Sequence, residues 1–279
     1  MATRYLMIHA DDAGLALSHN RAIQDGMLKG SISSCSLMVP TPWFYEMADF
    51  CLAHPELDYG IHLTLTGEWK YYPFRPLCAP EKIPTLVTSK GYFHPNREPF
   101  HSKVSSKEVY LELKSQIQFA LALGLKPSHL DSHMYVVGLR QDLLNVYEQL
   151  GKEFGLPILY SSSLSGYAGA KQSPLTLNQP DWEHIYMANF DHFEKEGLSA
   201  FYDEVIDHLP EGLSQLLIHP AYASASMDKI TFEHPNFGAA WRVADASYFN
   251  SVHCKKKIKE NDIILVGWKD VQRLTLLRA

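Results

Sequence analysis

Four apolar segments of the chain end in His or Asp, and these residues have the types and spacing that could do chemistry. The segments end as "LMIHADD", "YGIHLTL", "SHLDSHM" and "LLIHPAY". Histidine and aspartate without paired cysteines favour a divalent metal held by nitrogen and oxygen. Such a site leaves positions open for water and substrate, and a carboxylate beside that water is a natural general base. The pattern therefore predicts a metal-dependent enzyme.

The adjacent carboxylates of Asp11 and Asp12 are the most unusual feature of this pattern. Two such groups repel each other at the end of a buried strand. Successive side chains of a strand point in different directions, so Asp11 and Asp12 can have separate roles. A bound cation also makes their shared negative charge tolerable. The alternative is a helix cap, which we disfavour because Ser18 offers one. In "SHLDSHM", His129, Asp131 and His133 would share one face of a strand, so spacing does not choose among them.

The elements that must position these residues alternate along the chain. Strands are expected at 4–10, 34–40, 57–65, 128–136, 156–162, 214–222 and 262–268. Helices are expected at 18–29, 42–53, 105–123, 139–154, 194–208 and 238–253. Ser105 and Glu108 suggest a capping box for the third helix. Alternation of this kind indicates parallel strands with helical crossovers, hence an α/β fold whose strand ends converge on one catalytic face.

About seven such units predict a single barrel-like domain over residues 1–279, because no linker or low-complexity segment marks a boundary. Three long connections interrupt the alternation, at 66–104, 160–190 and 220–238. The first is rich in aromatic residues and prolines, as loops that shape a binding site often are.

Composition excludes several classes of function. The formal net charge is −6 and 46% of the 279 residues are hydrophobic. A nucleic-acid or anionic-membrane partner would require a basic surface, so we expect neither. The four cysteines are scattered, which predicts reduced thiols and a cytoplasmic protein. No signal peptide or membrane-spanning run is expected.

The motifs "ADDAG", "GIHLTLT", "HLDSH" and "HPAY", in this order, resemble the YdjC-like family, which includes chitooligosaccharide and hopanoid-type deacetylases. The resemblance extends from about residue 4 to the C-terminal strand and includes "GSISSCSLMVPTPWFYEMA" and "WRVADASYFNS". It implies an irregular (β/α) barrel and metal-dependent removal of acetyl groups from N-acetylated sugars. It also allows a homodimer.

The resemblance implies a role for each matching residue. Asp12, His62 and His133 would bind the metal, either Mg²⁺ or Zn²⁺. Asp11 would be the general base, and His219 would be the acid that protonates the leaving amine. Two further residues, Asp131 and Arg242, are candidates for orienting these groups, although Arg242 could equally form a surface ion pair.

This chain departs from the family pattern at two places. Met134, Tyr135 and Val136 follow "HLDSH" where members usually continue with further histidines, and His9 and Ala13 replace Asn and Phe of "NADDFG". The ligand set is retained while the pocket around it changes, which leaves the sugar, its length and phosphorylation, and the metal open.

Other functions are weighed against this one. A non-haem iron oxygenase would suit the "HLD" pattern but typically has an all-β fold. A phosphodiesterase would need an Arg or Lys cluster for phosphate, and a glycosidase would need two separated carboxyl groups. A non-catalytic sugar-binding protein on the same barrel would need neither the ion nor Asp11.

Overall fold

The computed structural model describes residues 3–161, 164, 182 and 184–276. Its strands are β1 (Arg4–Ala13), β2 (Ser34–Leu37), β3 (Tyr59–Leu63), β4 (Leu130–Ser132), β5 (His184–Met187), β6 (Gly212–Ile218) and β7 (Ile263–Leu265). Its α-helices are α1 (Leu17–Lys29), α2 (Phe44–Ala53), α3 (Ser106–Ala122), α4 (Gln141–Phe154), α6 (Leu198–Asp207), α7 (Ala225–Ile230), α8 (Ala239–Phe249), α9 (Val252–Glu260) and α10 (Trp268–Leu276). Short 3-10 or π-helical turns are η1 (Pro80–Lys82), η2 (Glu98–His101), η3 (His133–Gly138) and η4 (His192–Glu196).

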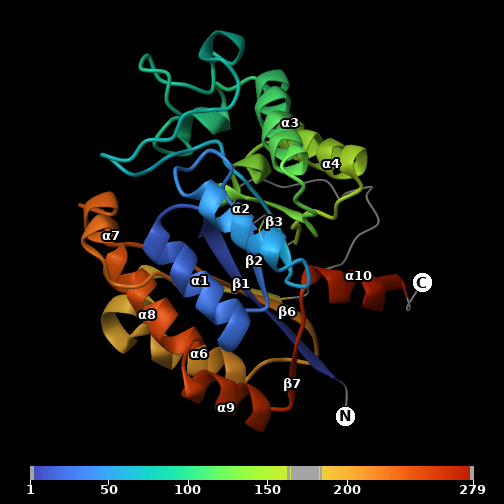
Figure 1. The fold of residues 1–279 in the computed structure, drawn as a ribbon, viewed down its shortest axis with the longest axis vertical. Helices are drawn as coiled ribbons and strands as arrows, with labels where there is room; N and C mark the ends of the chain where they lie inside the picture. The colour runs from blue at the N-terminus through green and yellow to red at the C-terminus, as the bar shows by residue number, and fades with distance from the viewer. Residues whose placement is uncertain (1–2, 162–163, 165–181, 183, 277–279) are drawn as a thin grey trace.

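All seven strands belong to one parallel sheet, in the order β4-β3-β2-β1-β6-β5, with β7 pairing the first residues of β1. The helices cover the outside of this sheet (Figure 1). Among the described residues no strand ladder joins β4 to β5, so the barrel is open there. The predicted irregular α/β barrel of about seven strands is confirmed. Because every strand runs in the same direction, the strand ends that carry His and Asp meet at one edge.

Strand β1 lies in the middle of the sheet and is buried on both faces, as parallel strands covered by helices are. Leu6 and Ile8 point toward the helices and belong to the main core. Met7 points into the barrel, where it packs with Trp182 and Trp268 in a smaller apolar cluster. Because side chains alternate along a strand, His9 and Asp11 follow Met7 on the interior face. The polar residues therefore form layers above an apolar floor.

The predicted capping interactions of two helices are wrong. Helix α1 begins at Leu17, its N-cap is Ala16, and Ser18 is not the cap. The loop before it is held instead by the Asn20 side chain, which accepts a hydrogen bond from the Gly14 N–H at 2.7 Å. Ser105 does occupy the N-cap of α3, but it makes no capping hydrogen bond. Glu108 accepts bonds from Thr85 rather than closing a capping box.

Three other expected elements also differ from the structure. Of the expected strand at 156–162, the described residues 156–161 form a single bridge, from Ile158 to Leu130, since Pro157 has no N–H to extend the ladder. Strand β5 lies in the expected loop at 160–190, of which 162–163, 165–181 and 183 fall outside the described residues. The expected helix at 238–253 is two helices, because the Ser251 side chain caps α9 by accepting a bond from the Cys254 N–H.

The other two long connections surround the site. The segment 66–104 contains η1 and η2 and gathers at the end of the molecule opposite the N-terminus, drawn in teal (Figure 1). The segment 220–238 contains α7.

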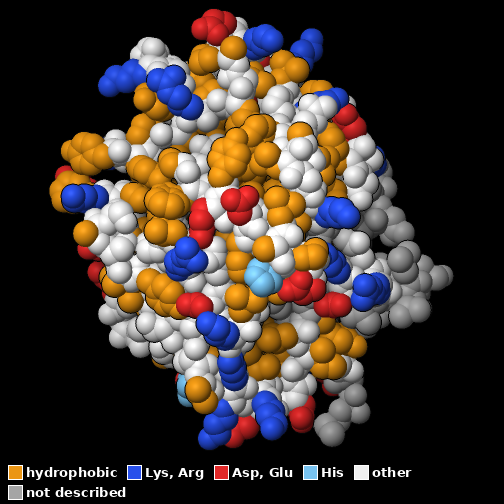
Figure 2. Space-filling model, in the orientation of Figure 1, with side chains coloured by type: hydrophobic (Ala, Val, Ile, Leu, Met, Phe, Trp, Pro, Cys, Tyr) orange, Lys and Arg blue, Asp and Glu red, His pale blue; other side chains and the backbone are white. Residues whose placement is uncertain are grey.

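Acidic and basic side chains are interspersed over the face drawn in Figure 2. No helix in the described part of the chain is long and apolar enough to cross a membrane.

Candidate active site

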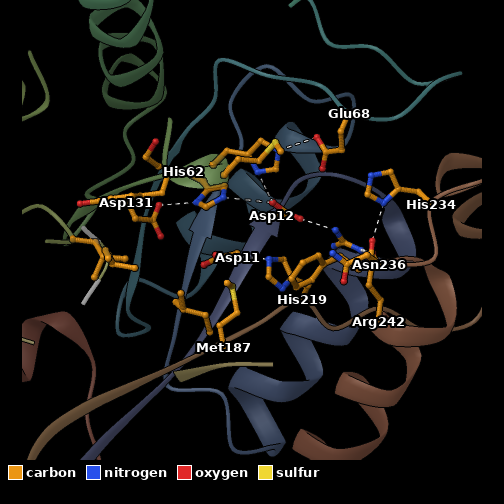
Figure 3. A pocket seen from close by; sticks show the side chains of 18 residues that line it. Asp11, Asp12, His62, Glu68, Asp131, Met187, His219, His234, Asn236 and Arg242 are labelled. Carbon is orange, nitrogen blue, oxygen red and sulfur yellow. Dashed lines mark hydrogen bonds and ion pairs between the residues drawn. The ribbon is translucent and has the colours of Figure 1, made fainter. Parts of the chain in front are cut away.

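A cavity of about 190 Å³ opens at the C-terminal ends of β1, β3, β4 and β6. Figure 3 shows the side chains that converge on it from these strands and from the loops beyond them. The cavity is lined by all of the residues predicted to be catalytic or metal-binding: Asp11, Asp12, His62, His133 and His219. The structure therefore brings together residues that are more than 200 positions apart in the sequence.

The predicted ligand trio of Asp12, His62 and His133 forms a compact group. One ligand atom from each residue lies within 4.8 Å of the others. Asp12 Oδ1 is 3.1 Å from His133 Nδ1 and 3.4 Å from His62 Nε2. The same oxygen is buried and has no well-aligned hydrogen bond among the described residues. One carboxylate oxygen and two imidazole nitrogens thus face a common point.

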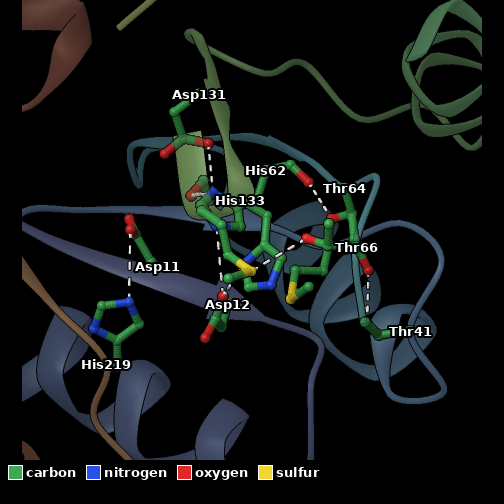
Figure 4. A network of polar contacts seen from close by, with 12 residues as sticks. Asp11, Asp12, Thr41, His62, Thr64, Thr66, Asp131, His133 and His219 are labelled. Atoms are coloured by element: carbon green, nitrogen blue, oxygen red, sulfur yellow. Dashed lines mark hydrogen bonds and ion pairs between the residues drawn. The ribbon is translucent and has the colours of Figure 1, made fainter. Parts of the chain in front are cut away.

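The second nitrogen of each imidazole is held by a carboxylate. His62 Nδ1 lies 2.8 Å from Asp131 Oδ1, and His133 Nε2 lies 3.0 Å from Glu68 Oε2 (Figures 3 and 4). Since a carboxylate accepts only, each imidazole donates that N–H, and its other nitrogen can offer a lone pair to the common point when the ring is neutral. Carboxylates that orient metal-binding histidines in this way are usual in metal centres.

Asp12 is fixed in an unusual backbone conformation. Its φ is +63°, a left-handed value that side chains other than glycine rarely adopt. The Arg242 guanidinium donates to Asp12 Oδ2 at 2.7 Å, and both side chains are almost fully buried. His19 Nε2 lies 2.8 Å from the carbonyl oxygen of Asp11, and its Nδ1 lies 3.4 Å from Arg242 Nη1. The turn in the backbone separates the two adjacent carboxylates.

Asp11 lies on the other side of the cavity and is held less tightly. Its Oδ1 is 3.3 Å from His9 Nε2, and its Oδ2 is 3.8 Å from His219 Nε2 (Figure 3). The backbone N–H of His219 donates to Asp245 at 2.8 Å, which fixes the start of this loop. Asp11 and His219 therefore face each other across a gap next to the ligand trio.

The pKa values of the two aspartates are shifted in opposite directions. Burial raises the pKa of Asp11 to about 6, although His62 partly offsets this effect. Burial also acts on Asp12, but Arg242 and His133 outweigh it and hold the pKa of this carboxyl well below its usual value. Asp12 is thus a permanent anion, whereas Asp11 can exchange a proton near neutral pH.

The histidines of the site also differ in acidity. Burial disfavours the charged form of His133, but Glu68 and Asp12 raise its pKa to about 9. Asp131 and Asp11 likewise overcome the burial of His62 and raise its pKa well above the usual range. Burial lowers the pKa of His219 far below its usual value, helped by Arg242. The carboxylates thus attract positive charge to the ligand trio and not to His219.

The structure shows which histidine of the "SHLDSHM" segment enters the cavity, a choice that sequence spacing left open. His129 does not line the cavity: its ring stacks on Trp268 at 4.7 Å in the interior. His133 reaches the cavity because β4 ends at Ser132 and the chain turns, with Met134 and Tyr135 at positive φ. The expectation of one extended strand through 128–136 is wrong for this reason.

Three further residues correct or extend the sequence analysis. Arg242 is buried and paired with Asp12, so the surface ion pair is excluded. Glu68 and His19 were not predicted. Glu68 is an ordinary loop residue in the sequence, and His19 lies in a helix where burial could not be anticipated. Only the contacts across the fold reveal them.

The donor set fits a divalent cation. Asp12 Oδ1 is an unsatisfied buried oxygen, and the two imidazoles beside it are oriented by Asp131 and Glu68. A carboxylate and two imidazoles are donors that Zn²⁺ and related divalent ions accept. The raised pKa values of His62 and His133 report the same anionic surroundings, which attract a metal ion as well as a proton.

Taken together, fold and site define a parallel α/β barrel with a His/Asp site of the metal-binding type at its strand ends. The model of the YdjC-like protein family matches residues 5–260, and the chain belongs to this family, as the sequence resemblance predicted.

Relatives with known names match along nearly their whole length. A carbohydrate deacetylase of Thermus thermophilus is 32% identical over 256 residues, covering 90% of this chain and 87% of the relative. A carbohydrate deacetylase of Thermoanaerobacter pseudethanolicus is 26% identical, and the match covers 95% of this chain and 98% of the relative. A crystal structure from Enterococcus faecalis V583, described as a cellobiose-phosphate cleavage protein, has a TM-score of 0.76 at 25% identity. It covers 97% of this chain and 99% of that one.

Proposed function

We propose that this protein is a metal-dependent carbohydrate N-deacetylase, which hydrolyses the amide bond of N-acetylated sugars. The observation that carries the proposal is the pairing of the ligand trio with a separate carboxylate, Asp11, across one small cavity. A metal centre with a free carboxylate beside it suits hydrolysis, because one group binds and the other moves a proton. The names of the relatives supply the substrate class.

In this proposal Asp12, His62 and His133 hold one divalent ion, Mg²⁺ or Zn²⁺. When bound, the ion supplies Lewis-acid polarisation of the amide carbonyl and a lowered pKa for water. Asp131 and Glu68 keep the imidazoles in the tautomers that bind it. Arg242 keeps the Asp12 carboxylate ionised and fixed. The protein thereby maintains the donor set before any substrate arrives.

Asp11 is proposed as the general base. A pKa raised to about 6 leaves the carboxylate ionised at neutral pH while making it more basic than an exposed aspartate. It can therefore take a proton from the attacking water molecule. The carboxylate of Asp12 cannot share this role, because Arg242 occupies its second oxygen.

His219 is proposed as the acid that protonates the leaving amine. Since its pKa lies well below the usual value, the ring is neutral at rest, and its proton must arrive during turnover. Asp11 is 3.8 Å away and gains a proton in the first step, so it is positioned to supply one. Because Asp11 has the higher pKa, the ring would carry this proton only as the leaving nitrogen takes it up, so the amide C–N bond breaks as the proton passes through His219.

The remaining walls of the cavity suit an acetylated sugar. Met187 and Leu217 provide apolar surface beside His219, of the kind that an acetyl methyl group would contact. His234 and Asn236 line the opposite part of the cavity, where they could contact sugar hydroxyls (Figure 3). A small polar and apolar surface of this sort orients a sugar without a phosphate-binding cluster.

The test is acetate release from N,N′-diacetylchitobiose with and without a chelator, together with metal analysis of the purified protein. We expect acetate release that the chelator abolishes and a divalent ion restores. Reducing sugar without acetate would indicate a glycosidase instead. A protein that binds the sugar but neither binds metal nor releases acetate would be the non-catalytic alternative.

A further inference from the structure

The strongest feature outside the proposed machinery is a buried polar layer directly beneath the cavity. His9 lies on β1, two residues before Asp11 and two after Met7, so all three side chains point into the barrel. Its side chain is fully buried and does not line the cavity. His9 thus lies between the apolar floor and Asp11.

One nitrogen of His9 makes all of its polar contacts. Nε2 lies 2.9 Å from Asp131 Oδ2, 3.3 Å from Asp11 Oδ1 and 3.2 Å from Ser36 Oγ. Two of these neighbours are carboxylate oxygens, which only accept, so Nε2 must carry a proton. The other nitrogen, Nδ1, is buried without a hydrogen-bond partner among the described residues.

The contacts of Asp131 show what this N–H connects. One oxygen of Asp131 accepts from His9, and the other accepts from His62 at 2.8 Å. His62 in turn faces Asp12 through its Nε2. A single chain of contacts therefore runs from Asp11 through His9, Asp131 and His62 to the ligand trio.

The carboxylate of Asp11 depends on the contact with His9, because it has fewer polar partners than the carboxylate of Asp12. Its Oδ1 is buried and has no well-aligned hydrogen bond among the described residues, and His9 Nε2 at 3.3 Å is its close polar neighbour, whereas Asp12 is held by Arg242. Without the His9 N–H, this oxygen would face the carboxylates of Asp12 and Asp131, and the remaining positive neighbour, His62, already directs its two nitrogens at those carboxylates. The carboxylate would then rotate away from the cavity or lose its fixed orientation.

We propose that His9 is a positioning residue: its one N–H, donated to Asp131, lies against the Asp11 carboxylate and holds that carboxylate facing the cavity. The inference rests on the proposed role of Asp11 as the base. Removing the donor disturbs proton transfer, while the ligand trio keeps the metal, because Glu68, Arg242 and the Asp131 oxygen that holds His62 all remain in place.

The test compares His9→Phe, which keeps a ring but loses the donor, with His9→Gln, which restores an N–H at similar reach. We expect His9→Phe to lower kcat about 100-fold, as a misplaced catalytic group does. KM and metal affinity should change less than about threefold, and His9→Gln should recover most of kcat. The matched control is His129→Phe, a neighbouring buried histidine 5.1 Å from His9 that does not contact Asp11.

A double-mutant cycle shows whether His9 acts through Asp11. In an Asp11→Asn background, adding His9→Phe should lower the residual kcat no further. An unchanged kcat in His9→Phe, a fall that adds fully to that of Asp11→Asn, or a parallel loss of metal would each overturn the proposal.

A crystal structure of His9→Phe gives a reading that does not depend on acetate release. We expect the Asp11 carboxylate to move or to split between conformers while Asp12, His62 and His133 stay in place. An unmoved Asp11 would refute the positioning role even if the reaction proved to be another hydrolysis. Absence of acetate release by the wild type would instead count against the proposed function alone.

Discussion

The two sides of the cavity are built differently, although they begin at adjacent residues of one strand. On the metal side, Asp12 is paired with Arg242 at 2.7 Å, and the imidazoles beside it are held by carboxylates at 2.8 and 3.0 Å. On the opposite side, the Asp11 carboxylate has, among the described residues, only the looser contacts to His9 at 3.3 Å and His219 at 3.8 Å. One side is fully supported and the other is loosely held.

The difference explains how two neighbouring carboxylates can coexist. The left-handed φ of Asp12 turns its side chain toward Arg242, while Asp11 continues the interior face of β1. In the proposed function, the permanent anion supports binding of a cation, and the carboxylate with a pKa of about 6 carries a proton. A rigid binding half and a proton-transferring half are what a hydrolytic metal site requires.

The largest expected effect is on the metal side. His62→Ala and His133→Ala each remove one of three donors, so we expect metal affinity to fall more than about 100-fold, beyond the loss that orienting residues cause. Isothermal titration with Zn²⁺ and with Mg²⁺ measures it. Full metal occupancy in either variant would remove that residue from the ligand set.

The next effect is on the proton-transferring side. His219→Asn should lower kcat by about 10²–10⁴-fold, the usual contribution of a general acid, while leaving metal content unchanged. Steady-state kinetics and metal analysis of the same preparation check both parts. If the variant lost its metal, the separation of the two sides would be wrong.

A smaller effect is expected from Glu68→Gln. The amide keeps the size of the side chain but not the charge that orients His133 and raises its pKa. We expect metal affinity to fall about 10–100-fold. Glu98→Gln, which alters an exposed salt bridge with Lys103 in the same loop, is the matched control and should leave the affinity unchanged.

The smallest expected effect is the change of kcat/KM with pH. Asp11 must be ionised to act as a base, so kcat/KM should be maintained above its pKa and fall as the pH decreases through it. With a pKa of about 6, the rate should be halved near pH 6, and a bound cation would move this midpoint lower. A midpoint above pH 7 in the wild type, or an unchanged profile in Asp11→Asn, would contradict this assignment.

The sequence predicted the fold and the residues that meet in the cavity because both depend on local patterns. Apolar runs followed by His or Asp mark the ends of parallel strands, and parallel strands bring those ends together. The supports could not be predicted in this way. Glu68 meets His133 across 65 positions and His9 meets Asp131 across 122, and no local pattern encodes such contacts.

The local errors have the same origin. Ser18 and Glu108 have suitable types for capping, but tertiary neighbours, Ser224 and Thr85, take up their side chains. His129 and His133 are equivalent on an extended strand, and only the turn after Ser132 sends one into the cavity and leaves the other against Trp268. The residue types therefore indicated which side chains could act in a site, while the directions in which those side chains point required the structure.

The most direct test of the two-sided site is a comparison of Asp11→Asn with Asp12→Asn, measuring bound metal and acetate release in the same preparations. We expect Asp11→Asn to retain its metal while kcat falls by about 10³-fold or more, and Asp12→Asn to lose both metal and activity. Loss of metal from Asp11→Asn, or full metal occupancy in Asp12→Asn, would contradict the division between a binding and a proton-transferring carboxylate.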